Sequence, residues 1–123
     1  MGYNTDVIIS GEFRFEIGEV GNQIIKAIGT EPYFYAMEHY IYDDWWVVAC
    51  EVHGDAQERV LDFLLPFAKQ VPDIVFMVDG DGDETWDLWR MYIKGDKSYA
   101  ISLVIDPEFD ESKLHDRSLE DTK

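Results

Sequence analysis

The amino-acid sequence predicts an α+β domain, in which a mainly antiparallel sheet of about six strands is covered on one face by two helices. Apolar and polar residues alternate in several stretches, as in half-buried strands, and apolar residues recur every three or four positions in two others, as in amphipathic helices. The predicted order is β-α-β-β-α-β-β-β. Paired strands between single helices favour helices packed against one face of an antiparallel sheet.

The first strand and the first helix are predicted from the change of apolar period near residue 16. Residues 7–15 alternate between apolar and polar side chains, which indicates a half-buried strand. Residues 17–28 follow helical spacing. We expect this helix to begin near Glu19, because Gly18 and Gly21 weaken its first turn.

Residues 32–53 predict a long hairpin that turns at Asp43-Asp44, because dense aromatic and β-branched segments flank two polar residues. Its second strand has a wholly apolar row that is expected to face the helices: Trp46, Val48, Cys50 and Val52.

A capping box predicts where the second helix begins. The Asp55 carboxylate is expected to accept hydrogen bonds from the first backbone N–H groups of the helix. The Glu58 carboxylate is expected to accept one from the backbone N–H of Asp55. Pro66 is expected to kink this helix or to shorten it to about three turns.

The second half of the chain predicts a strand at 73–78, an acidic glycine-rich turn at 79–84, and strands at 85–94 and 99–105. Gly95-Asp96 between the last two matches a type II′ hairpin turn. We expect one domain over residues 1–106 and an acidic tail over 107–123 with room for one short helix. The first four strands and two helices match the ferredoxin-like pattern.

The charge balance excludes several classes of protein. The 123 residues include 26 Asp and Glu against 10 Lys and Arg, a formal net charge of −16, whereas nucleic acids and anionic membranes are bound by clustered Lys and Arg. With 46% hydrophobic and 15% aromatic residues, the chain is not of the disordered type.

The cysteine content and the hydropathy pattern indicate a cytoplasmic protein. Cys50 is the only cysteine, so no intramolecular disulfide and no Cys-based zinc site is expected. The N-terminus has no signal-peptide pattern, and no apolar run approaches the ~20 residues of a membrane-spanning helix.

No ordered catalytic set emerges, and no cofactor is expected. The segment 79–84 has carboxylates at alternate positions, but it lacks the Gly and Glu positions of a calcium-binding EF-hand loop, which favours a solvated hairpin loop over a weak metal site. Cys50 is expected to be buried and inert. His39 and His53 are expected on neighbouring strands, where either is able to meet Glu38 or Glu51, although a structural role is the simpler interpretation.

The sheet face that points away from the helices is expected to combine carboxylates with aromatic rings, which is typical of binding surfaces. Its residues are Glu38, Tyr40 and Tyr42 on one strand and Trp45, Glu51 and His53 on the next. The alternative is that the tail covers this face through Phe109, Leu114 and Leu119.

The leading functional hypothesis is a non-enzymatic acidic inhibitor whose carboxylates mimic nucleic-acid phosphates and occupy the basic surface of a nuclease or other nucleic-acid-processing protein. A phage inhibitor of host defence, directed at restriction or CRISPR effectors, and an immunity protein against a nuclease toxin are the biological forms considered. The expected contact residues are Glu38, Tyr40, Asp43, Asp44, Trp45, Asp79, Asp81, Asp83, Glu84 and Asp87. The alternatives are a small-ligand or metal-binding enzyme that uses His39, Glu51 or His53, and a homo-oligomeric structural subunit, with a homodimer as one form.

The N-terminal residues resemble a group of small phage and bacterial proteins that begin Met-Gly-Tyr-x-Thr and continue into a strand with Gly-Glu-Phe. In this sequence the matching residues are Met1, Gly2, Tyr3, Thr5, Gly11, Glu12 and Phe13. The pattern from residue 61 to 101 is also similar. The resemblance implies a phage or bacterial α+β protein of the cytoplasm and implies no catalytic residue.

Overall fold

The computed structural model describes residues 4–82, 88–102 and 109–116. Its elements, in chain order, are β1 (Asn4–Glu12), α1 (Phe15–Ile28), β2 (Phe34–Tyr42), β3 (Trp45–His53), α2 (Ala56–Ala68), β4 (Val75–Gly82), β5 (Leu88–Lys94), β6 (Lys97–Ser102), the 3₁₀ helix η1 (Glu111–Lys113) and the two-residue strand β7 (His115–Asp116).

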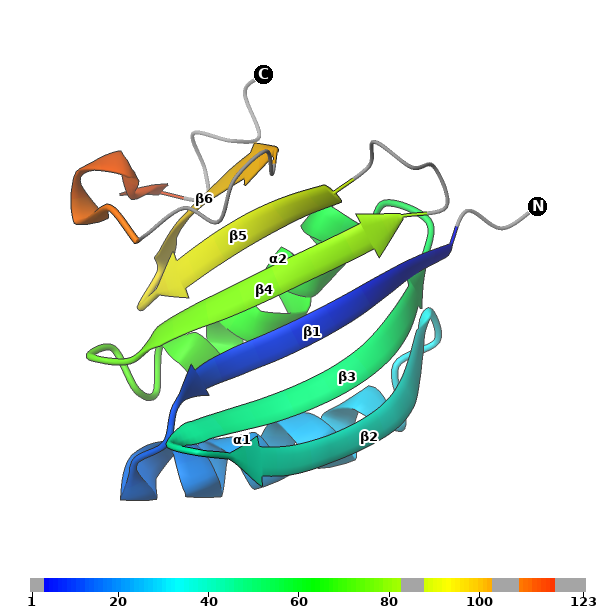
Figure 1. The fold of residues 1–123 in the computed structure, drawn as a ribbon, viewed down its shortest axis with the longest axis horizontal. Coiled ribbons are helices and arrows are strands. Elements are labelled where there is room, and N and C mark those ends of the chain that lie inside the picture. Colours follow the sequence, from blue (N-terminus) through cyan, green and yellow to red (C-terminus); the bar gives the residue numbers. More distant parts are fainter. Residues whose placement is uncertain (1–3, 83–87, 103–108, 117–123) are drawn as a thin grey trace.

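The strands form one sheet in the order β2-β3-β1-β4-β5-β6-β7, and all neighbouring pairs are antiparallel. Both helices lie behind this sheet, with α1 over the β2–β3 side and α2 over the β4–β5 side (Figure 1). The predicted α+β class is therefore confirmed. The order β2-β3-β1-β4, with one helix after β1 and one after β3, is the ferredoxin-like arrangement, and β5 and β6 extend it beyond β4.

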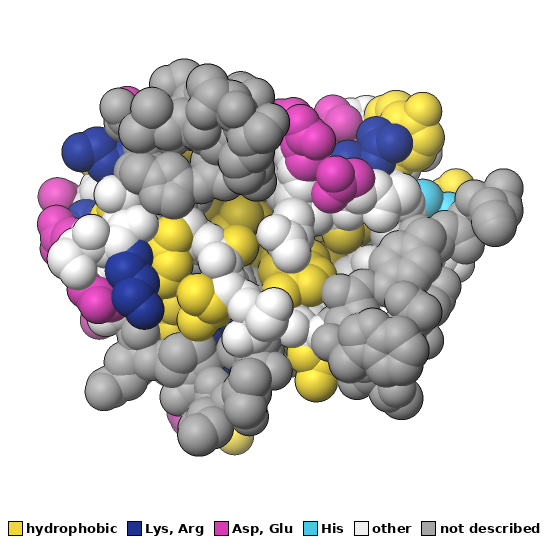
Figure 2. Space-filling view, turned by 90° about the horizontal axis from the view of Figure 1, so that it is seen from above, with side chains coloured by type: hydrophobic (Ala, Val, Ile, Leu, Met, Phe, Trp, Pro, Cys, Tyr) yellow, Lys and Arg dark blue, Asp and Glu magenta, His cyan; other side chains and the backbone are white. Residues whose placement is uncertain are grey.

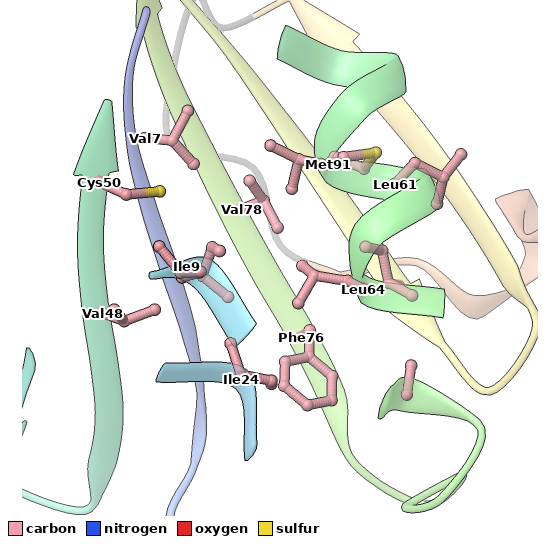
Figure 3. Packing of buried hydrophobic residues seen from close by; sticks show 14 of the residues in the cluster. Val7, Ile9, Ile24, Val48, Cys50, Leu61, Leu64, Phe76, Val78 and Met91 are labelled. Atoms are coloured by element: carbon pink, nitrogen blue, oxygen red, sulfur yellow. The ribbon is translucent and has the colours of Figure 1, made fainter. Parts of the chain in front are cut away.

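The core lies between the sheet and the two helices and is centred on β1. Ile9 is fully buried and is paired with Val48 of β3 on one side and with Val78 of β4 on the other. Figure 3 shows side chains from these strands and from both helices meeting around Ile9. Burial of each such side chain contributes about 1.5–3 kcal/mol to folding, so this cluster is the main source of stability.

Helix α1 begins at Phe15, one turn earlier than the sequence suggested, so the expected start near Glu19 was wrong. The strand that was expected to reach residue 15 ends at Glu12. The helix includes Gly21 at a buried position because the Trp46 indole packs where a larger side chain would lie. The tertiary contact therefore compensates for the weak helix propensity of glycine.

Helix α2 follows its predicted cap. The Asp55 carboxylate accepts a hydrogen bond from the Glu58 backbone N–H at 3.4 Å. Pro66 lies in the last turn, and the helix ends at Ala68, so it has 13 residues. Pro66 is exposed, so its ring does not disturb the packing of the core.

The hairpin of β2 and β3 is confirmed, with Asp43 and Asp44 in its turn and Asp43 in the left-handed region at φ 53°. The predicted apolar row of β3 is buried against the helices. A register shift between Ala36 and Glu38 leaves Met37 as a bulge in β2.

The expected turn at 79–84 was wrong over residues 79–82, because β4 continues through Asp79 to Gly82, and residues 83 and 84 lie outside the described residues. Asp79 is paired with Arg90 of β5, which satisfies its charge within the sheet. Gly80 lies opposite Trp89, whose indole occupies the space that a side chain at residue 80 would need. The Gly-Asp alternation over residues 79–82 is typical of a loop, but contacts with Trp89 and Arg90 of β5 hold it in a strand.

The hairpin of β5 and β6 turns at Gly95-Asp96, and Gly95 has a φ of 62°, as a type II′ turn requires. β6 begins at Lys97, before the predicted start at residue 99. The predicted strand residues 85–87 and 103–105 lie outside the described residues.

The described C-terminal residues pack on the open side of the sheet. The Phe109 ring lies 5.3 Å from that of Tyr92 and 6.2 Å from that of Tyr99, between ring centroids. The Tyr99 hydroxyl accepts a hydrogen bond from the Asp110 backbone N–H at 2.7 Å. Phe109 therefore covers the open face over β5 and β6, but the aromatic and acidic part of the face on β2 and β3 stays exposed, so the alternative of a tail over that part is not seen in the described residues. Leu114 is half-buried, and Leu119 lies outside the described residues.

We predict that Gly80→Ala destabilises the fold by about 1–3 kcal/mol, because its methyl group collides with the buried Trp89 indole. Gly18→Ala is the matched control, since its methyl group would meet only Phe13 ring carbons at 3.7 and 3.8 Å, and alanine favours a helix interior by about 1 kcal/mol. Urea denaturation measures both free energies of unfolding. Equal stability of Gly80→Ala and the wild type would contradict the packing.

Candidate functional site

The sheet face that points away from the helices holds part of the predicted contact set. Register places Glu38, Tyr40 and Tyr42 of β2 opposite Ala49, Val47 and Trp45 of β3, all facing away from the helices. The expected side-by-side arrangement of this aromatic and acidic face is confirmed. Its exposed rings are Tyr35, Tyr40, Tyr42 and Trp45, which are 41–66% exposed.

The structure does not bring the other predicted acids to this group. Asp43 and Asp44 lie in the β2–β3 turn, next to the C-terminal end of β1. Asp79 lies opposite Ile8 in the middle of β1, and Asp81 lies opposite Asp6 near its N-terminal end, so neither joins Asp43 and Asp44. The remaining predicted contacts lie outside the described residues: Asp83, Glu84 and Asp87.

Asp79 is not a free negative charge. Arg90 Nε donates to its Oδ1 at 2.5 Å and Arg90 Nη2 donates to its Oδ2 at 3.0 Å, in a half-buried two-point ion pair. Arg90 side-chain exposure is 12% and that of Asp79 is 31%, so water competes weakly for this pair. Asp79 is therefore a structural acid within the β4–β5 pair and a poor phosphate mimic.

Register aligns three carboxylates that the sequence did not group. Asp6 of β1 is paired with Glu51 of β3 on one side and with Asp81 of β4 on the other. Directly opposite side chains on neighbouring antiparallel strands have Cβ atoms about 4.5–5.5 Å apart, and like charges there are destabilising. We call Glu51, Asp6 and Asp81 the carboxylate row.

Asp6 was missed because only register links it to the other two acids. Alternation with the buried Val7 already predicts that Asp6 faces away from the core. Its neighbours come from β3 and β4, which are distant in the sequence, so no local pattern identifies them.

One end of the carboxylate row has a tyrosine and a histidine as neighbours. Tyr35 is paired with Glu51, and its ring lies 4.8 Å from the His53 ring, between centroids. His53 Nε2 lies 3.5 Å from Glu51 Oε1.

The histidines of the alternative enzyme hypothesis do not converge. His53 lies on the open face beside Glu51, whereas His39 is paired with Val48 and lines a groove on the helix side of the sheet. Among the described residues, no three His, Cys, Asp or Glu side chains are grouped so that they could hold a metal ion.

Cys50 points into the core between β3 and β1 (Figure 3). Burial raises the pKa of its thiol to about 12. The reactive thiolate is therefore absent near neutral pH, as the expected inert role requires.

The surface is not uniformly acidic. Seen from above, where β6 and η1 lie, Lys and Arg side chains are interspersed with Asp and Glu (Figure 2). Lys94 Nζ lies 3.5 Å from Glu111 Oε1 on this side, for example. The net charge alone therefore does not locate a binding site.

Comparison of the chain with models of known protein families, with curated proteins and with solved structures gives no match. In the described part of the chain, neither helix has the length and apolar character needed to cross a membrane.

We predict that Cys50 in the folded protein does not react with a thiol reagent at pH 8, and that it reacts fully once urea unfolds the chain. The folded pKa lies above the unfolded one, so the stability from the buried neutral thiol is present below pH 9 and is lost as pH rises toward 12. Colorimetric thiol titration measures the reaction. Rapid labelling without denaturant would show that the thiol is accessible.

We predict that Asp6→Asn stabilises the isolated protein by about 0.5 kcal/mol, because it removes the shared charge from both like-charge pairs of the carboxylate row. Glu16→Gln, at an exposed helix position, is the matched control and should lack this gain. Thermal unfolding at low ionic strength measures the difference, which should shrink in high salt. A lower midpoint for Asp6→Asn would contradict repulsion within the row.

Proposed function

We propose that this protein is a non-enzymatic binding protein that presents carboxylates to a basic protein surface, in competition with nucleic acid. The partner class is a nuclease or another nucleic-acid-processing protein, whose phosphate-binding surface is built from Lys and Arg. Carboxylates would occupy positions that phosphates occupy in the nucleic-acid complex, so inhibition would be competitive.

The carboxylate row is the observation that best supports this proposal. Asp6 and Asp81 are exposed, and Glu51 is half-exposed, so all three are accessible to a partner. Like charges directly opposite on neighbouring strands are unfavourable, so a cationic partner that binds across the row would relieve that repulsion.

The aromatic side chains on the same face as the row suit a protein partner. Tyr35 lies directly opposite Glu51, and Tyr40 and Trp45 extend the face toward the β2–β3 turn; each is more than two-fifths exposed. Aromatic residues anchor protein interfaces through a large apolar area, and each of these also has a polar group at its edge. The charges would then guide the encounter, and the rings would provide the contact area.

The enzyme alternative has less support from the geometry. His39 and His53 lie on opposite faces of the sheet, and Cys50 is buried with a raised pKa. The described residues therefore offer no nucleophile with an adjacent base.

The test compares two triple variants in a pull-down from a bacterial lysate at low and high salt, with identification of the captured proteins. Both variants change the net charge from −16 to −13. The row variant is Asp6→Asn, Glu51→Gln and Asp81→Asn. The control variant neutralises exposed acids away from the open face: Glu16→Gln, Glu31→Gln and Asp73→Asn.

We predict that the wild type and the control variant capture a basic nucleic-acid-binding protein that high salt or added DNA releases, and that the row variant captures at least about ten-fold less of it. The reason is that only the row variant loses the aligned carboxylates. Equal capture by the row and control variants would refute the proposal for this face.

A further inference from the structure

Strand β2 is an uncovered edge of the sheet. It lies at the end of the strand order, and no described strand pairs with its outer side. Apart from Phe34, all of its residues are exposed. Natural edge strands are usually protected by Pro, Lys or a bulge, and over its nine residues β2 has only the bulge at Met37 and the charge of Glu38.

Exposed apolar side chains gather around this edge. Of the 11 exposed large hydrophobic residues in the described chain, all but Ile8 and Leu88 lie in β2, just before it, or beside its hairpin end. They are Phe13, Phe15, Tyr33, Tyr35, Met37, Tyr40, Ile41, Tyr42 and Trp45. Apolar patches of this kind are uncommon on monomers and mark interaction sites.

A groove of about 660 Å³ adds to the apolar surface on the helix side of β2. It lies between α1 and the strand, and it is lined in part by Phe13, Phe15, Ile25, His39 and Ile41. Large exposed side chains therefore lie on both faces of the edge strand, with Glu38 as the one carboxylate among them, which suits another strand with the same pattern better than a charged surface.

The charge of β2 indicates the occupant. In a chain of net charge −16, this strand has a single acid, Glu38, and no Lys or Arg. The outer edge of this strand therefore offers a basic partner a single carboxylate. A second copy of the chain could approach along this strand with little repulsion, because its own β2 is equally poor in charge.

We propose that β2 pairs antiparallel with β2 of a second copy, so that the two sheets become one in a homodimer with two-fold symmetry. Tyr42 and Trp45 flank the two-residue turn, so Tyr40 and Tyr42 direct their backbone groups toward β3, whereas His39 and Ile41 direct theirs outward. In the proposed register the two Tyr40 residues lie opposite each other. His39 then forms backbone hydrogen bonds with Ile41 of the second copy.

The same register separates the acids of the two copies. Glu38 lies opposite Tyr42 of the second copy, whose hydroxyl is a hydrogen-bond donor, and the two Glu38 side chains do not face each other. The net charges of the two copies still repel at long range. Salt should therefore strengthen this dimer, the opposite of its effect on binding a basic protein.

The test is sedimentation equilibrium of the purified full chain at low and high salt, over about a hundred-fold range of concentration. The edge variant is Ile41→Lys. The matched control is Ile8→Lys, the same change at a residue of similar exposure, 46% against 57%, on the central strand β1. Circular dichroism reports whether each variant is folded.

We expect the wild type and Ile8→Lys to dimerise more strongly in high salt, and Ile41→Lys to dimerise at least about ten-fold more weakly. His39→Pro is a second edge variant, since it removes an outward N–H and leaves the pairing with β3 intact, and it should also be monomeric. A wild type that stays monomeric in high salt, a folded His39→Pro dimer, or a dimer lost only in Ile8→Lys would overturn the proposal. None of these results depends on a basic partner, so they do not test the proposed function, which the pull-down tests independently.

Discussion

The pairing of β1 with β3 on one side and with β4 on the other determines both the core and the open face of this protein. Val7 and Ile9 are buried against the helices, so Asp6 and Ile8 must point to the opposite side. Because the side-chain period of a strand is two, a slip of one residue would place Asp6 in the core. The burial of the apolar half of β1 is thus what holds Asp6 between the carboxylates of Glu51 and Asp81.

Two surfaces of different chemistry share the sheet. The open face has aligned carboxylates on its central strands β3, β1 and β4, whereas the β2 edge is rich in exposed apolar and aromatic side chains and has one carboxylate. Coulomb attraction to a basic partner weakens with salt, while apolar association of like-charged copies gains from it. The two surfaces can therefore serve different partners at the same time, and ionic strength separates their contributions.

Prediction from the sequence succeeded where local pattern and local energy agree, and failed where a neighbouring strand decided the outcome. The cap at Asp55 and the turn at Asp43-Asp44 follow from residues close in the chain. The segment from Asp79 to Gly82 resembles a loop by composition, yet Arg90 and the Trp89 indole hold it in the sheet. A short stretch of sequence around residues 79–82 does not include these contacts, because they come from the neighbouring strand.

By itself, the sequence determined the fold class, the apolar row of β3 and the aromatic and acidic face of the β2–β3 hairpin, because periodicity and turn chemistry act over a few residues. Only the tertiary structure decided that Asp79 forms an ion pair with Arg90 and that Asp6, Glu51 and Asp81 form a row. It also decided that the bulge at Met37 brings Tyr35 to the same face as Glu38. These features depend on the register between strands far apart in the chain, which is fixed by the packing of the whole core.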